Sequence, residues 1–374
     1  MKKLYSSLLL TILLLVLSAP TQAQKTANDY LTRSHALLEA GDIEGAIGEL
    51  NKAIKAQPDY DEAYFQRSLL KMMKFDLDGS LADASKAIEI NPNMAQAYSQ
   101  RGEIYVMKDE HAAALHDFDQ AIARGYRTDL VYMQRARLKM SDGNNAGAID
   151  DFTIAISLNP EAAGAYVGRG SAYMSQENHQ GALDDFNFVI DRFEKTKGQK
   201  ALPKTMVMAS SPNALKPVKK TVDGKEVDEV RTLVGFTSEA RTVEEAELGP
   251  NVAGAYMNRG IIFSERGQSD AAIRDFTRAI EIFPGNFAAY DSRGSERQKK
   301  GDLNGALADF NESIKLNPQI PYTYLDRGVV LLLLGKEAKA QKDFDQTLRL
   351  SPDLKSAVEK RIEEAKKQRE TMTP

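Results

Sequence analysis

The sequence predicts an all-α protein in which eight copies of a helical hairpin stack into a solenoid. Prolines that would end a helix recur at a constant interval, at Pro58 and Pro92 and again at Pro284, Pro318 and Pro352. Apolar and small residues recur between these prolines with helical spacing. Two helices of this length cannot cover their own apolar face, so neighbouring hairpins must stack.

Alignment of the copies on their prolines, taken as position 32, shows which positions are constant. Position 4 is tyrosine in every copy, at Tyr30, Tyr64, Tyr98, Tyr132, Tyr166, Tyr256, Tyr290 and Tyr324. Position 8 is glycine, alanine or serine, position 20 is alanine or serine, and position 24 is phenylalanine in six copies. Position 15 is glycine in five copies.

The constant positions account for a hairpin. Positions 4, 8 and 11 share one face of the first helix, and positions 20, 24 and 27 share one face of the second. Glycine at position 15 ends the first helix and turns the chain. Small residues at positions 8 and 20 let the two backbones approach, and the aromatic ring at position 24 fills the space that remains.

This pattern resembles the tetratricopeptide repeat family. In one copy the resemblance is carried by Tyr256, Gly260, Phe263, Ala272, Phe276, Ala279 and Pro284. It extends over residues 27–194 and 250–352, with departures at Phe75, Ala84, Tyr126 and Glu194. The resemblance implies a right-handed superhelical solenoid whose first helices line the concave surface.

An arginine stands at position 7 of all eight copies, and an acid always follows it at position 23. Positions 7 and 23 face each other across a hairpin that turns near position 15, so we expect an ion pair between the two helices. This structural ladder pairs Arg33 with Glu49, Arg67 with Asp83, Arg101 with Asp117, Arg135 with Asp151, Arg169 with Asp185, Arg259 with Asp275, Arg293 with Asp309 and Arg327 with Asp343. The alternative is a row of arginines for an acidic ligand, and the matched acids favour internal neutralisation.

The N-terminal stretch from Met1 to Ala23 predicts a secretory signal peptide. Lys2 and Lys3 precede an apolar run from Leu8 to Leu17, and Ala23 completes a cleavage pattern of small residues. An uncleaved membrane anchor is the alternative, although the run is short for a span. The sequence has no cysteine, which excludes disulfides and an acylated cysteine. We therefore expect an exported bacterial protein, periplasmic or extracellular, without a stable membrane span after cleavage.

The regular phase of the repeat breaks between the fifth and sixth copies, where a long segment is inserted. We expect repeats over residues 24–194 and 250–352, a largely irregular insertion over 195–249, and a capping helix and tail over 353–374. Val222 and Lys225 flank a turn signal that indicates a small β-hairpin. The insertion fits either a solvated loop or a partner-docking arm.

Residues that vary between copies indicate a binding surface. The resemblance places positions 2, 5, 9, 12 and 13 of each first helix on the concave face. The candidate groove residues there are Phe65, Leu69, Met72, Met73, Met107, Met133, Met140, Met174, Met257 and Ile261. Methionine makes adaptable contacts with apolar or helical segments. The alternative is that these side chains pack between adjacent first helices.

Features of catalytic and metal sites are missing from the sequence. His111 and His116 are too far apart along the chain for the spacing that a helical metal pair prefers. The sequence has no nucleophile motif and no phosphate-binding glycine loop. The net charge of −4 does not favour nucleic acid as a partner. We therefore expect no cofactor, no metal and no enzymatic activity.

The leading hypothesis is an exported, non-catalytic scaffold or adaptor. As the resemblance implies, it would bind peptide or helical segments of other proteins on its concave surface. The alternative makes the insertion at residues 195–249 the docking element and the repeats a rigid frame. An unrecognised enzyme is the third hypothesis, and it would need an unpaired carboxylate or histidine buried in a cleft.

Overall fold

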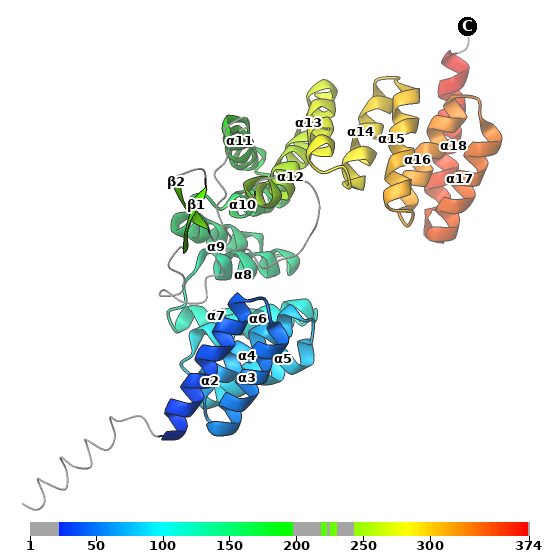
Figure 1. Ribbon diagram of the computed structural model, residues 1–374. Coiled ribbons are helices and arrows are strands. Elements are labelled where there is room, and N and C mark those ends of the chain that lie inside the picture. Colours follow the sequence, from blue (N-terminus) through cyan, green and yellow to red (C-terminus); the bar gives the residue numbers. More distant parts are fainter. Residues whose placement is uncertain (1–21, 197–217, 223–224, 230–242, 373–374) are drawn as a thin grey trace, which may run out of the picture. The chain divides into compact units, whose positions relative to one another are not determined.

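The computed structural model describes residues 22–196, 218–222, 225–229 and 243–372 (Figure 1). The predicted signal peptide lies almost wholly outside these residues, as does much of the predicted insertion. The described helices α2 to α17 follow one another in the predicted order of eight pairs. The all-α solenoid prediction is therefore confirmed. None of the described helices is both long enough and apolar enough to span a membrane.

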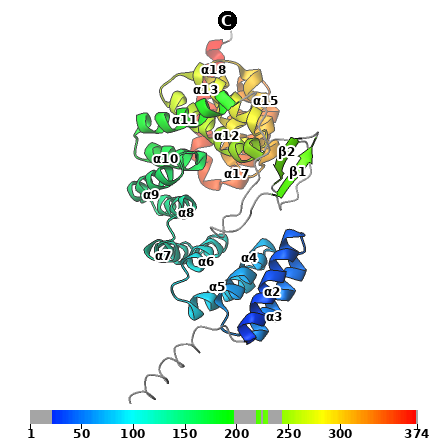
Figure 2. The same cartoon turned by 60° about the vertical axis from the view of Figure 1, so that its left-hand side comes forward.

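The chain divides into two compact units, Met1–Asp142 and Gly143–Pro374. The first unit contains α2 (Gln22–Glu39), α3 (Ile43–Ala56), α4 (Asp61–Met73), α5 (Leu77–Ile90), α6 (Ala95–Met107), α7 (His111–Ala123) and α8 (Asp129–Ser141). Its helices pair as α2 with α3, α4 with α5 and α6 with α7 (Figure 2). Each later first helix also packs on the second helix before it.

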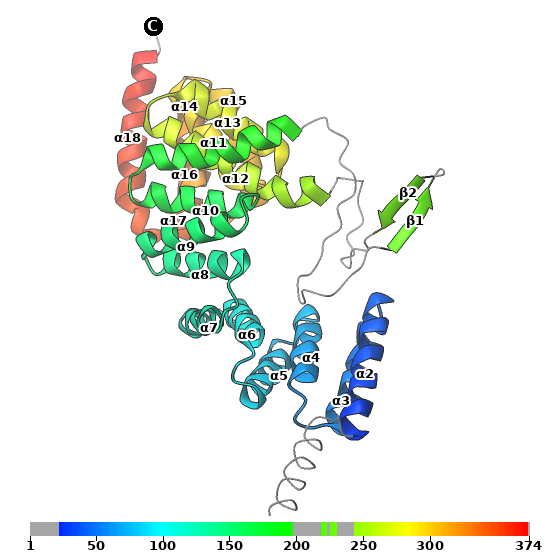
Figure 3. The ribbon, with the colours of Figure 1, turned by 90° about the vertical axis from the view of Figure 1, so that its left-hand side faces the viewer.

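The second unit contains α9 (Asn145–Leu158), α10 (Ala163–Ser175), α11 (His179–Thr196), α12 (Val243–Glu265), α13 (Ser269–Ile282), α14 (Phe287–Lys299), α15 (Leu303–Leu316), α16 (Pro321–Leu333) and α17 (Glu337–Leu350). A short 3-10 turn, η1 (Pro352–Leu354), leads into α18 (Lys355–Met372). The pairs are α10 with α11, α12 with α13, α14 with α15 and α16 with α17. Figure 3 shows α18 running beside this unit, where it packs on α16.

All eight turns between first and second helices use a residue in the left-handed region at position 15. Five are the predicted glycines, Gly41, Gly143, Gly267, Gly301 and Gly335, with φ between 70° and 84°. The other three are Phe75, Asp109 and Glu177, with φ of 60° to 62°. The turn conformation is therefore constant even where a side chain makes it unfavourable.

The close approach predicted within each hairpin is present. A Cβ atom added to Gly260 would lie 2.7 Å from the ring of Phe276, and one added to Gly328 would lie 2.6 Å from Phe344. In the second repeat Ala84 replaces the aromatic residue, and Ser68 takes the place of glycine. The Ser68 hydroxyl is 3.0 Å from that of Ser80, so hydrogen bonds replace ring packing there.

Two described pieces belong to the predicted insertion. Strand β1 (Val218–Val222) pairs antiparallel with β2 (Lys225–Glu229), so the predicted hairpin is present. Helix α12 begins at Val243, inside the insertion that was expected to be largely irregular, and runs through Pro250. Proline lacks the backbone N–H of a helix interior, so it removes one hydrogen bond there. The neighbouring Val252 is fully buried, so packing holds this turn in place.

The predicted capping helix corresponds to α18. Its apolar face carries Val358 and Ala365, which are 3% and 2% exposed, and Leu354 of η1 lies beside them in the same cluster. Arg361 of α18 donates to Asp326 of α16 over 2.7 Å. The remaining face of α18 is charged and exposed, as the end of a repeat array requires.

Candidate binding surface

Successive first helices contact each other along part of the first unit and along the second. Contacts join α4 to α6 in the first unit, and α10, α12, α14 and α16 in succession in the second. Among the described residues, the second helices of successive repeats do not contact each other as extensively as these first helices do. We call positions 2, 5, 9, 12 and 13 of the first helices the first-helix surface. The sequence assigned the candidate groove to these positions.

Most candidate groove side chains are partly accessible on the first-helix surface. Met107 is the most open, with 44% of its surface exposed. The half-buried members are Leu69, Met72, Met73, Met133, Met140, Met174, Met257 and Ile261. Met73 also packs on the core of the first unit, and Met174 and Met257 pack on that of the second. The packing interpretation therefore applies to Met73, Met174 and Met257, and the assignment of the set to a ligand groove stays a prediction.

Phe65 is the exception among the candidate residues. It is 6% exposed and lies in a cluster with Ile88 and Tyr98, from α5 and α6. The next repeat covers position 5 of α4, so Phe65 packs between the second and third repeats. It offers no exposed aromatic ring to a ligand.

Six arginines of the ladder form two parallel hydrogen bonds with the acid at position 23 of the same repeat. The Nε and Nη2 atoms of each arginine donate to the two carboxylate oxygens over 2.6–2.9 Å. The pairs are Arg67 with Asp83, Arg101 with Asp117, Arg169 with Asp185, Arg259 with Asp275, Arg293 with Asp309 and Arg327 with Asp343. These acids are at most 6% exposed, so each pair is a largely desolvated link between two helices.

The Nη1 atom of seven ladder arginines binds the preceding repeat. Sequence reasoning missed this contact. Nη1 donates over 2.6–3.3 Å to position 25 of the preceding repeat, as from Arg67 to Asn51 and from Arg259 to Asn187. A signal for this contact exists in the sequence. Position 25 is an acceptor in every copy, at Asn51, Ser85, Asp119, Thr153, Asn187, Thr277, Asn311 and Asp345. Each of the six arginines that bond their own acid twice therefore ties three helices together.

Two ladder positions differ from the rest. The side chain of Arg33, on the first described helix, is 58% exposed and lies 3.7 Å from Glu49. Arg135 donates to Asp119 over 2.6 Å within the first unit. Its predicted partner Asp151 belongs to the second unit, so that pair stays a prediction.

The constant tyrosine lies beneath the arginine of the same copy. In all eight copies the guanidinium carbon is 4.6–5.7 Å from the centre of the tyrosine ring. This distance permits a cation–π contact. The constant tyrosine therefore supports the arginine of its own copy.

Two acids of the first-helix surface are desolvated without a nearby cation. Burial raises the pKa of Glu103, at position 9 of α6, and among the described residues Glu103 makes no hydrogen bond or ion pair. Burial raises the pKa of Asp291, at position 5 of α14, from 3.8 to about 6. The charge of Asp326 contributes in the same direction, and Thr323 opposes it.

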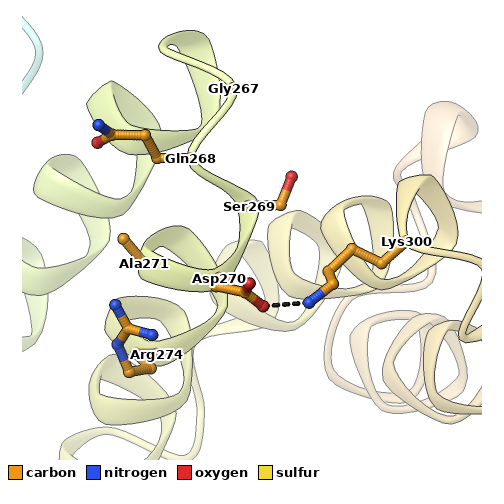
Figure 4. A pocket seen from close by; sticks show the side chains of 7 residues that line it. All are labelled: Gly267, Gln268, Ser269, Asp270, Ala271, Arg274 and Lys300. Atoms are coloured by element: carbon orange, nitrogen blue, oxygen red, sulfur yellow. Dashed lines mark hydrogen bonds and ion pairs between the residues drawn. The ribbon is translucent and has the colours of Figure 1, made fainter.

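One hollow within the second unit lacks the lining of a catalytic centre. It has a volume of about 470 Å³ and lies beside the turn from α12 to α13, where Asp270 and Lys300 form an ion pair (Figure 4). Its remaining lining is Gly267, Gln268, Ser269, Ala271 and Arg274. No nucleophile–base pair lines it. Among the described residues, no three histidine or acidic side chains are grouped so that they could hold a metal ion.

Comparison with known proteins identifies the repeat. Tetratricopeptide repeat family models match residues 31–95, 133–193, 253–286 and 287–320, together about half of the chain. The chain belongs to the tetratricopeptide repeat family. Proteins with tetratricopeptide repeats bind other proteins or peptides. No curated protein matches the sequence.

The chain is also similar to solved structures, three of which follow. MamA is 25% identical over 48% of this chain and 99% of its own, with a TM-score of 0.44. A tetratricopeptide repeat protein from Parabacteroides merdae is 16% identical over 91% of this chain and 99% of its own, with a TM-score of 0.46. The Cut9–Hcn1 structure is 14% identical over 85% of this chain and 48% of its own, with a TM-score of 0.51. This last likeness concerns the fold alone.

Proposed function

We propose that this tetratricopeptide repeat protein is a non-catalytic scaffold or adaptor that binds peptide or helical segments of other proteins on its first-helix surface. The partly exposed methionines of that surface carry the proposal. Met107, Met133 and Met140 present flexible thioether side chains on two successive first helices, α6 and α8. Such side chains adapt to apolar faces of different shapes.

The repeated residues support the proposal by fixing the helices that carry this surface. Six arginines are committed to acids in their own repeat, and all six also bind the preceding repeat. A surface that is already ordered spends less binding free energy on ordering when a segment docks. The side chains that vary between copies are then free to set specificity.

A random peptide library displayed on phage tests this proposal. The unmodified protein is expected to enrich a consensus with apolar residues at helical spacing. A Met107→Glu/Met140→Glu double variant, checked for helicity by circular dichroism, is expected to lose that enrichment. The matched control is Ile154→Glu, which places the same charge on a second helix at a side chain that is 38% exposed.

The insertion is the alternative docking element, and its paired strands β1 and β2 are the described feature that favours it. A variant that lacks residues 197–242 separates the two proposals. Enrichment that survives the deletion supports the first-helix surface. Enrichment that survives the double methionine variant and disappears on deletion contradicts the proposal and assigns binding to the insertion.

Export is a further part of the proposal. Its support is the N-terminal sequence, in which a short apolar run lies between Lys3 and Ala23. Mass spectrometry of the protein from a bacterial periplasmic fraction is expected to find Gln24 at the N-terminus. A membrane-bound product that retains the apolar run would show an anchor instead.

A further inference from the structure

Asp291 is an acid that folding partly removes from water without giving it a cation. It lies at position 5 of α14, on the first-helix surface of the second unit. Its Oδ1 atom is buried and has no hydrogen-bond partner that meets standard geometry. Desolvation of a carboxylate without compensation is costly, so such a group favours an incoming positive charge.

A second polar group beside Asp291 is also unsatisfied. Thr323 of α16 is fully buried, and its hydroxyl oxygen has no hydrogen-bond partner within standard geometry. Thr323 acts on Asp291 as a side-chain hydrogen-bond donor, which opposes the rise in the pKa of Asp291. The contact does not meet standard hydrogen-bond geometry, so the two buried groups satisfy each other only weakly.

The nearby cations are all committed to other acids. Arg361 of α18 donates to Asp326 over 2.7 Å. On α14 itself, Arg293 and Arg297 donate to Asp309 over 2.7–2.9 Å. Lys299 pairs with Glu296 over 2.5 Å. Asp291 and Asp326 thus share a neighbourhood that contains two carboxylates and one guanidinium group.

We propose that Asp291, which keeps part of its surface accessible, binds one lysine or arginine side chain of a segment bound on the first-helix surface. This inference rests on the proposed function and names the chemistry of its partner. One ammonium or guanidinium group supplies both the missing charge and the missing hydrogen-bond donors. A metal ion fits less well, because the described residues offer no group of three ligands.

The first unit repeats the feature independently. Glu103 lies on α6 at position 9 of the first-helix surface, is half-buried, and forms no hydrogen bond or ion pair with a described residue. Met107 stands one turn further along the same helix. The partner segment therefore combines cationic residues with apolar ones, since both are complementary to this surface.

The test extends the library selection to Asp291→Asn, which removes the charge at nearly constant shape. Glu359→Gln, an exposed position on α18, is the matched control for the loss of one charge. The unmodified protein and the control are expected to fix a lysine or arginine at one position of the consensus. Asp291→Asn is expected to keep the apolar positions and to lose that cationic preference.

A binding titration with one selected peptide tests whether its cationic residue contacts Asp291. Replacement of the cationic residue by norleucine is expected to weaken binding to the unmodified protein at least about tenfold. The same replacement should change binding to Asp291→Asn little, because the two changes remove the same interaction.

The outcomes separate this inference from the proposed function. Selection of apolar peptides without a fixed cation, or a cation preference that Asp291→Asn retains, overturns the inference alone. Failure of the unmodified protein to enrich any peptide overturns the proposed function, and the inference with it.

Discussion

Replacement of Asp291 by asparagine is expected to stabilise the second unit at neutral pH and to have little effect near pH 4. Burial raises the pKa of Asp291 to about 6 in the folded protein, against 3.8 for the ordinary carboxyl. The folded state therefore holds the proton more tightly than the unfolded state does. Stability is lost as pH rises from about 4, and the loss is complete above about pH 6.

The size of this loss follows from the two pKa values. One pKa unit corresponds to about 1.4 kcal/mol, so the difference between 3.8 and about 6 amounts to about 3 kcal/mol of unfolding free energy. Asp291 keeps part of its surface in contact with water, which lowers the expected value to about 2 kcal/mol. Asparagine carries no charge at any of these pH values, so the unfolding free energy of Asp291→Asn does not decrease in this way.

Hydrogen exchange followed by mass spectrometry suits this measurement, because repeat arrays unfold in parts. Peptides from α14 and α16 are compared at several pH values between 4.5 and 7.5, after correction for the intrinsic exchange rate. Protection in Asp291→Asn should exceed that in the unmodified protein increasingly as pH rises, whereas Glu359→Gln should show no such trend. A difference that is constant with pH, or lower protection in Asp291→Asn at pH 7.5, would refute the reasoning.

The ladder and the close helix contacts give two further predictions, both measured by urea unfolding. Asp117→Ala leaves Arg101 without its buried partner and is expected to lower the free energy of unfolding by about 3–5 kcal/mol. A decrease of less than about 1 kcal/mol would contradict the ladder. Gly260→Ala forces a Cβ atom to within 2.7 Å of Phe276 and is expected to cost about 1–3 kcal/mol. Gly48→Ala has open space around it and should stabilise helix α3 by up to about 1 kcal/mol, so equal effects at the two glycines would contradict the packing argument.

Features that depend on spacing within one repeat were predictable from the sequence. The hairpin needs only the helical period, a turn at position 15 and a small residue opposite an aromatic one. The left-handed turn at Phe75 follows from the same register, although the residue type argues against it. The arginine–acid pairs also follow, because both partners belong to one hairpin.

Features that depend on the next repeat were harder to predict. Phe65 was assigned to the groove by its position, yet the following repeat buries it at 6% exposure. The bond from each arginine to position 25 of the preceding repeat was missed, although Asn51 and its equivalents form a regular pattern. Helical spacing identifies the face on which a residue lies, and only neighbouring helices determine how much of it remains exposed.

The desolvated acids of the first-helix surface could not be found from the sequence. Asp291 is one of many acidic residues, and nothing in its immediate neighbours marks it. Its state depends on Thr323 and Asp326 of another helix and on the commitment of Arg361 in a third. These are long-range relations that a repeat pattern does not encode.

The central claim, that partners bind on the first-helix surface, can be tested with photo-reactive methionine. Seven methionines of the chain lie at candidate groove positions, and two lie in the insertion, Met206 and Met208. The seven are Met72, Met73, Met107, Met133, Met140, Met174 and Met257. The labelled protein is irradiated with a peptide selected by the unmodified protein, and the cross-linked residues are identified by mass spectrometry. Cross-links at the groove methionines are the predicted result. Cross-links confined to Met206 and Met208 would contradict the claim and place the partner on the insertion.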